Sequence, residues 1–165
     1  MCKRKVCLVR RIEGVCLFVP KCNQGRGTKM KKEELVKKAY EAQKFSYSPY
    51  SGFQVGAALL TKSGNVYTGC NIENAAFSPT NCAERTAFFK AISEGETEFE
   101  AIAVVGNKKD ALPEEREFCM PCGVCRQVML EFVNPEEFLI YSGKGEEIKV
   151  FTLKQLLPES FSLVN

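Results

Sequence analysis

The chain has 165 residues, 45% hydrophobic and 26% charged, and this composition predicts a single soluble globular domain with a substantial core. Histidine is absent, which excludes a Ser-His-Asp triad, a histidine zinc site and a histidine general base. The net charge of +3 is uneven, because residues 1–29 carry +7 and residues 30–165 carry −4, so the body of the chain is a poor non-specific binder of nucleic acid.

Nine cysteines, an odd number, cannot all pair within one chain. The longest apolar run of the basic head, Val15 to Val19, is shorter than the roughly 7 to 15 residues of a secretory signal core, and no run approaches the roughly 18 residues that span a bilayer. We therefore expect a cytoplasmic protein with no membrane partner, whose cysteines are metal ligands or buried apolar residues.

The chain divides at Met30, where the basic head ends. Residues 1–29 have no helical periodicity and only short apolar runs, so we expect a basic N-terminal extension that is poorly ordered or loosely docked, with Met30 as a possible physiological start. Residues 30–165 are expected to form one domain.

Periodicity and turn residues predict alternating helices and strands. Helices are expected at 30–45, 82–94, 123–132 and 152–157, and strands at 53–61, 66–72, 101–105, 138–141 and 148–151. Thr80 or Asn81 is the expected N-cap of the second helix, and residues 107–118 are expected to form a charged loop. This order, with one opening hairpin, indicates an α/β layered domain with a mixed sheet.

Three cysteines have the spacing of a metal site. Cys122 and Cys125 are three residues apart at the start of a predicted helix, and Cys82 lies just after another predicted helix cap. Three protein ligands with an open fourth position are typical of catalytic zinc. Helix N-termini favour thiolates, and Arg85 and Arg126 are the available counter-charges.

Glu84, two residues after Cys82, is placed to lie beside the metal without ligating it, as a general base acting on zinc-bound water requires. The segments Cys82-Ala83-Glu84 and Pro121-Cys122-Gly123-Val124-Cys125 match the signature of the zinc deaminases, whose glutamate shuttles protons.

With these and the segments FQVGAALL, GCNIENAAFS and LLPESF, residues 31–161 resemble a cytidine deaminase of the small, three-cysteine zinc type. The resemblance implies a three-layer α/β/α domain around a mixed sheet of about five strands, one Zn²⁺ per chain and a homotetramer. It also implies hydrolytic deamination of cytidine and deoxycytidine to uridine and deoxyuridine, with release of ammonia, in pyrimidine salvage.

The resemblance further assigns substrate contacts. Asn71 and Glu73 are expected to hold the ribose hydroxyls, and Phe53 to lie against the base. Backbone groups around Ala83 and the Glu84 side chain are expected to read the base edge. The expected supporting residues are Arg85, which hydrogen-bonds to the ligand sulfurs, Phe77, which stands where the family often has tyrosine, and Phe161.

Other interpretations stay open at this point. Buried thiols or a redox pair explain the three cysteines less well than a metal site does. A closed site that also includes Cys119 would leave no water for Glu84 to act on. A polynucleotide-editing deaminase, a non-catalytic zinc-stabilised binding module and deaminases of nucleotides or aminonucleoside antibiotics are the rival functions. The acidic body argues against the first, and a carboxylate at Glu73 would repel a nucleotide phosphate.

Overall fold

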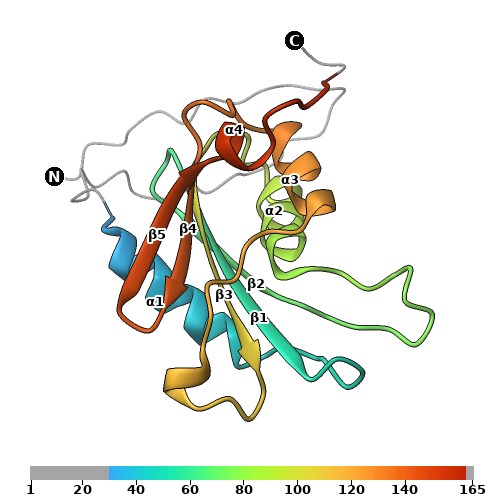
Figure 1. Cartoon of the computed structure of the whole chain (residues 1–165). Helices are drawn as coiled ribbons and strands as arrows, with labels where there is room; N and C mark the ends of the chain where they lie inside the picture. The colour runs from blue at the N-terminus through green and yellow to red at the C-terminus, as the bar shows by residue number, and fades with distance from the viewer. Residues whose placement is uncertain (1–29, 163–165) are drawn as a thin grey trace, which may run out of the picture.

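A computed structural model of the chain describes residues 30–162, so the expectation for the head, residues 1–29, lies outside the described part. The fold is built on one five-stranded sheet with the strand order β2-β1-β3-β4-β5 (Figure 1). The strands are β1 (Phe53–Thr61), β2 (Val66–Cys70), β3 (Phe99–Lys108), β4 (Leu139–Lys144) and β5 (Glu147–Thr152). The helices are α1 (Lys32–Gln43), α2 (Ala83–Ser93), α3 (Gly123–Leu130) and the short α4 (Leu153–Leu156), with a 3₁₀ turn, η1 (Pro113–Glu115).

The pairing of the strands follows from their connections. Tight turns at Gly64 (φ 89°) and Gly145 (φ 60°) join β1 to β2 and β4 to β5, and both pairs are antiparallel. Strands β1 and β3 are also antiparallel, whereas β3 and β4 are parallel because the chain returns through α3. The sheet is therefore mixed, as the alternation of elements predicts.

Helices cover both faces of the sheet (Figure 1). One core cluster joins α1 to one face, and includes Leu35, Ala39 and Leu60. The other cluster joins α2 and α3 to the opposite face around the fully buried Phe88, whose ring lies 5.0 Å from that of Phe99. The expected three-layer α/β/α architecture is confirmed.

Two glycines let the helices approach the sheet closely. A Cβ on Gly56 would lie 2.1 Å from the carbonyl oxygen of Ala39 in α1, and a Cβ on Gly69 would lie 2.4 Å from the carbonyl oxygen of Ala83 in α2. Both contacts are with backbone, which cannot rotate aside. Because glycine has no side chain at these two positions, each helix can pack directly against the sheet.

Some element boundaries differ from those expected. Helix α2 begins at Ala83 with Cys82 as its N-cap, rather than Thr80 or Asn81, because Asn81 is held extended in a bridge with Ile72. Strand β2 ends at Cys70, and β3 runs from Phe99 to Lys108, beyond the expected 101–105 and into the predicted loop, because its ends pair with both ends of β1. Among residues 30–162, no helix combines the length and the apolar character that a membrane crossing needs.

Candidate metal centre and active site

Three thiols converge where two helices begin. Cys82 is the N-cap of α2 and Cys122 the N-cap of α3, and Cys125 lies in the first turn of α3. The three Sγ atoms lie within 4.8 Å of one another, and those of Cys82 and Cys122 are 3.9 Å apart. The fold creates this cluster by placing α2 and α3 side by side on one face of the sheet.

The donor set and its spacing fit zinc. With Zn–S bonds of about 2.3 Å, tetrahedral geometry requires sulfur atoms about 3.8 Å apart, close to the separation of Cys82 and Cys122. Cys122 is exposed while Cys125 is fully buried, so the site opens toward solvent on one side. Cys119 is not part of the group, and burial raises its pKa to about 12, which keeps its thiol protonated.

Charge at the thiols is shared unequally. A hydrogen bond with Cys125 lowers the pKa of Cys82 to about 5, with a further contribution from the Arg85 guanidinium. The same bond raises the pKa of Cys125, and burial adds to the effect. The backbone N–H of Cys125 also points at the Cys122 sulfur, 3.5 Å away. The cluster thus already stabilises a thiolate, the form that binds metal.

Of the two arginines considered as counter-charges, Arg85 contacts the cluster. Its guanidinium lies 3.7 Å from the Cys82 sulfur and also donates to the carbonyl of Thr80 at 3.0 Å. The guanidinium of Arg126 donates instead to backbone carbonyls, those of Pro121 and Leu156. Arg126 therefore fixes the entry to α3 and its packing against the C-terminal segment.

Glu84 is a buried carboxyl group beside the thiols. It lies in the first turn of α2 and is only 4% exposed. Burial raises the pKa of Glu84 to about 7, and the negative charge of Cys82 acts in the same direction. A carboxyl group with this pKa both accepts and donates protons near neutral pH, which is the property of a proton shuttle.

Asn71 and Glu73 follow β2, at the same end of the sheet, and each has partners within the chain. The Asn71 amide donates to the carbonyl of Phe53 at 2.8 Å and accepts from the N–H of Val55 at 2.8 Å. The Glu73 carboxylate accepts from the hydroxyl and N–H of Ser51 and from the N–H of Tyr50. These bonds lower the pKa of Glu73, the Ser51 hydroxyl having the largest effect. Both side chains are fixed, and each keeps hydrogen-bonding capacity for a ligand.

The aromatic candidates lie in different surroundings. Phe53 opens β1 and is 38% exposed, whereas Phe77 and Phe161 are each 70% exposed. Phe77 has a φ of 57° in the loop after β2, and its ring packs against that of Tyr50 at 5.9 Å. Ala83 is fully buried and lies between Cys82 and Glu84 in the sequence. The structure thus places Ala83 beside the cluster of three thiols and leaves Phe77 and Phe161 on the surface of the chain.

Sequence reasoning missed the residues that hold the proposed ligand groups in place. Ser46 donates to the Oδ1 of Asn71, and Ser51 donates to Glu73. No motif marks either serine, because both depend on contacts made across more than twenty residues of chain.

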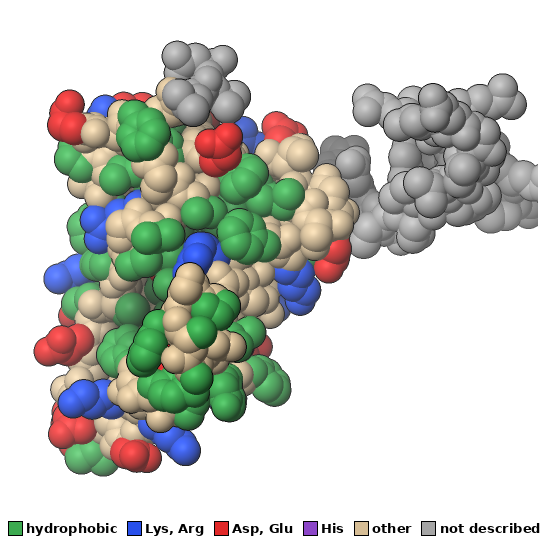
Figure 2. Space-filling model, turned by 90° about the vertical axis from the view of Figure 1, so that its right-hand side faces the viewer, with side chains coloured by type: hydrophobic (Ala, Val, Ile, Leu, Met, Phe, Trp, Pro, Cys, Tyr) green, Lys and Arg blue, Asp and Glu red, His purple; other side chains and the backbone are tan. Residues whose placement is uncertain are grey.

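One face of the chain exposes many hydrophobic side chains (Figure 2). Large apolar residues are exposed in the two segments around residues 45–50 and 72–77, which a bridge between Tyr47 and Ile72 holds side by side. The exposed residues of these segments are Phe45, Tyr47, Tyr50, Ile72 and Phe77. A monomer rarely exposes so many large apolar side chains together.

Comparison with known proteins identifies relatives over most of the chain. Residues 29–141 match the family described as the cytidine and deoxycytidylate deaminase zinc-binding region. The chain is 48% identical to a cytidine deaminase of Halalkalibacterium halodurans over 134 residues, covering 81% of this chain and 96% of the relative. It is 46% identical over 130 residues to one from Sporosarcina psychrophila, covering 79% of this chain and 90% of the relative.

The fold is similar to that of a solved relative. The crystal structure of cytidine deaminase from Burkholderia pseudomallei superposes with a TM-score of 0.71 and 41% identity, over 80% of this chain and 100% of that one. With the three-thiol cluster and its neighbouring buried glutamate, these similarities show that the chain belongs to the cytidine and deoxycytidylate deaminase family of zinc enzymes.

Proposed function

We propose that the protein hydrolyses cytidine and deoxycytidine to uridine and deoxyuridine with release of ammonia, a reaction of pyrimidine salvage. The observation that carries the proposal is the buried Glu84 beside the converging thiols of Cys82, Cys122 and Cys125. A structural zinc site is closed by four protein ligands and binds no water, so a buried carboxyl group beside it would have no proton to transfer. The curated relatives at 46% and 48% identity are named as cytidine deaminases.

The three thiolates would hold one zinc ion per chain. When bound, zinc would lower the pKa of a water molecule, so that hydroxide is available to attack C4 of the pyrimidine at neutral pH. Glu84 would take one proton from the attacking water and deliver it to N3 of the base. It would then take the second proton from the hydroxyl added at C4 and give it to the amino group, which leaves as ammonia. Since the chain contains no histidine, one carboxyl group performs all of these transfers.

The remaining site residues orient the nucleoside. The backbone around Ala83 reads the base edge, and the exposed face of Phe53 lies against the ring. Asn71 and Glu73 bind the ribose hydroxyls, since their side chains are fixed by neighbouring backbone groups and retain free hydrogen-bonding positions. Arg85 offsets the charge of the thiolates, and Phe77 and Phe161 support the site from the surface of the chain.

The assembled enzyme is proposed to be a cytoplasmic homotetramer. The exposed aromatic residues of segments 45–50 and 72–77 support association, because burial in an interface removes their apolar surface from water. The sizes of the particles in solution, measured by light scattering, test this part of the proposal. A monomer at micromolar concentration would contradict it.

A substrate panel with one isosteric variant tests the reaction. The wild-type protein is expected to deaminate cytidine and deoxycytidine, monitored by the loss of absorbance of the cytosine band, and to leave CMP, free cytosine and adenosine largely unchanged. Glu84→Gln should keep its zinc and its fold and lose about 10²- to 10⁴-fold in kcat. A zinc-replete Glu84→Gln protein with near-normal turnover would show that another group moves the protons.

A further inference from the structure

The ring of Phe53 and the thiol of Cys119 share the space that Gly106 leaves open. Gly106 lies in β3 opposite the start of β1. A Cβ built on Gly106 would lie 2.7 Å from the Cys119 sulfur and 2.9 Å from the ring carbon Cε1 of Phe53. Real Cβ atoms essentially never come this close to another atom, so both side chains can occupy the space beside residue 106 only because it is glycine.

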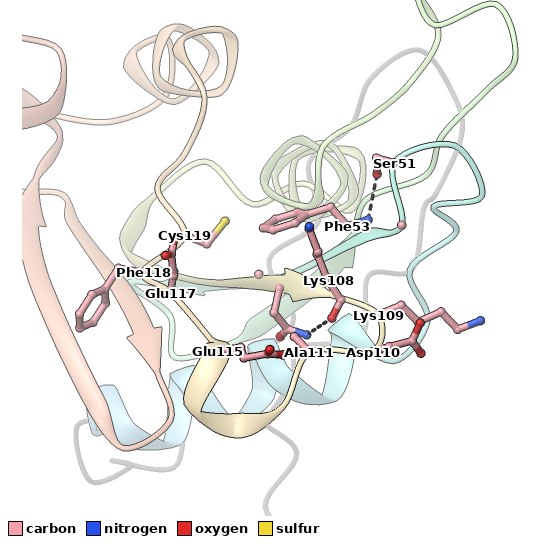
Figure 3. Close-up of a pocket in the computed structure, with 13 residues that line it drawn as sticks. Ser51, Phe53, Lys108, Lys109, Asp110, Ala111, Glu115, Glu117, Phe118 and Cys119 are labelled. Carbon is pink, nitrogen blue, oxygen red and sulfur yellow. Dashed lines mark hydrogen bonds between the residues drawn. The ribbon is translucent and has the colours of Figure 1, made fainter.

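Both side chains line a cavity of about 780 Å³ at this end of the sheet. Figure 3 shows the Phe53 ring pointing from the start of β1 toward Cys119, with Lys108 nearby. Ser51, which holds Glu73, lines the same cavity. The cavity therefore adjoins both the proposed base contact and the proposed sugar contact.

Strand β4 and the β4–β5 hairpin hold the segment that contains Cys119 in place. The fully buried hydroxyl of Ser142 in β4 donates to its carbonyl oxygen at 2.9 Å. Two lysines of the β4–β5 hairpin place their ammonium groups over the ring of the preceding residue, Phe118. The nitrogen of Lys149 lies 4.2 Å from the ring centroid and that of Lys144 lies 5.9 Å from it. The backbone at Cys119 is thus held to the sheet, and a thiol beside an aromatic ring makes a favourable contact.

We propose that Cys119 and Gly106 are positioning residues, which together set the tilt of the Phe53 ring and thereby the fit of the pyrimidine nucleoside. The inference rests on the proposed function, in which Phe53 lies against the base. Neither residue belongs to the group of three thiols or is a proposed proton carrier, although Cys119 lies close enough to Glu84 and Cys82 to feel their charge. Their effect belongs to ground-state binding, which appears in KM while kcat stays unchanged.

Three variants test the contact. Cys119→Ala removes the support and is expected to raise KM for cytidine about fivefold with kcat within about twofold, the size expected for loss of one sulfur–aromatic contact. Cys119→Val refills the space and should return KM to within about twofold of the wild-type value. Gly106→Ala displaces the ring and should raise KM at least as much as Cys119→Ala.

Cys70→Ala is the matched control. Its half-buried thiol donates to the carbonyl of Phe45, and its removal should leave KM unchanged. Zinc content and thermal midpoint are measured for every variant, because a purely structural role for Cys119 would lower the midpoint and leave KM alone.

The outcomes separate the two proposals. If the wild-type protein does not deaminate cytidine, the proposed function fails and the inference falls with it. If it does, an unchanged KM in Cys119→Ala, or a raised KM that Cys119→Val does not rescue, overturns the positioning role alone. Should Gly106→Ala fail to fold, the two Cys119 variants decide the question by themselves.

Discussion

Adding a single methyl group at Gly69 should disable the site from a distance. The new Cβ would lie 2.4 Å from the carbonyl oxygen of Ala83, against a normal contact of about 3.3 Å, so the first turn of α2 must move by roughly 1 Å. That turn carries Cys82 and Glu84. We expect a loss of about 1–3 kcal/mol in the free energy of unfolding from overpacking. We also expect kcat/KM to fall on the order of 10²-fold, since a displacement of this size misplaces the proton shuttle.

Gly56→Ala is the matched control for this experiment. Its backbone clash with Ala39, at 2.1 Å, is at least as severe, but it lies on the α1 face and away from the thiols. Urea unfolding, zinc content and cytidine turnover per folded molecule are compared for both variants. The control should lose stability while its folded molecules retain activity. A Gly69→Ala protein with the wild-type kcat/KM and full zinc content would refute the argument that the β2–α2 contact sets the geometry of the site.

Three further outcomes are expected. Cys82→Ala should lose its zinc in metal analysis, whereas Cys119→Ala should keep it; full zinc in the first variant would rule out the three-thiol site. Asn71→Ala and Glu73→Gln should raise KM for cytidine more than they lower the thermal midpoint, and equal use of free cytosine and cytidine by the wild type would contradict their role at the sugar. Phe88→Ala should lose about 3–5 kcal/mol in chemical unfolding, since the ring is fully buried; a loss under about 1 kcal/mol would mean that the core around it collapses to refill the space.

The fold was largely predictable because its signals are local. The apolar period of α1, the turn residues around Gly64 and the helix formers after Cys82 each depend on a short stretch of sequence, and the structure confirms all three elements. The boundaries were less predictable. Thr80 and Asn81 have the residue types of a helix N-cap, but the bridge between Asn81 and Ile72 holds that segment extended and moves the cap to Cys82.

The metal cluster was predictable for a different reason. Cys82, Glu84 and the pair Cys122 and Cys125 lie at spacings that chemistry restricts, and the structure brings the three thiols together. The residues that position the site could not be predicted in this way. The contact of Gly106 with Cys119 and Phe53 joins three segments across the sheet, and nothing in the neighbourhood of any one of them indicates the other two.

The placement of the ligands along the chain has a consequence for the order of assembly. Cys82 follows the β1–β2 hairpin, whereas Cys122 and Cys125 lie in the connection between the parallel strands β3 and β4. A hairpin forms quickly because its strands are neighbours in sequence, but a parallel pair must first close the whole connection between its strands. The thiols therefore meet only after that connection has closed. A metal ion bound there would link the late-forming part of the domain to the early-forming part.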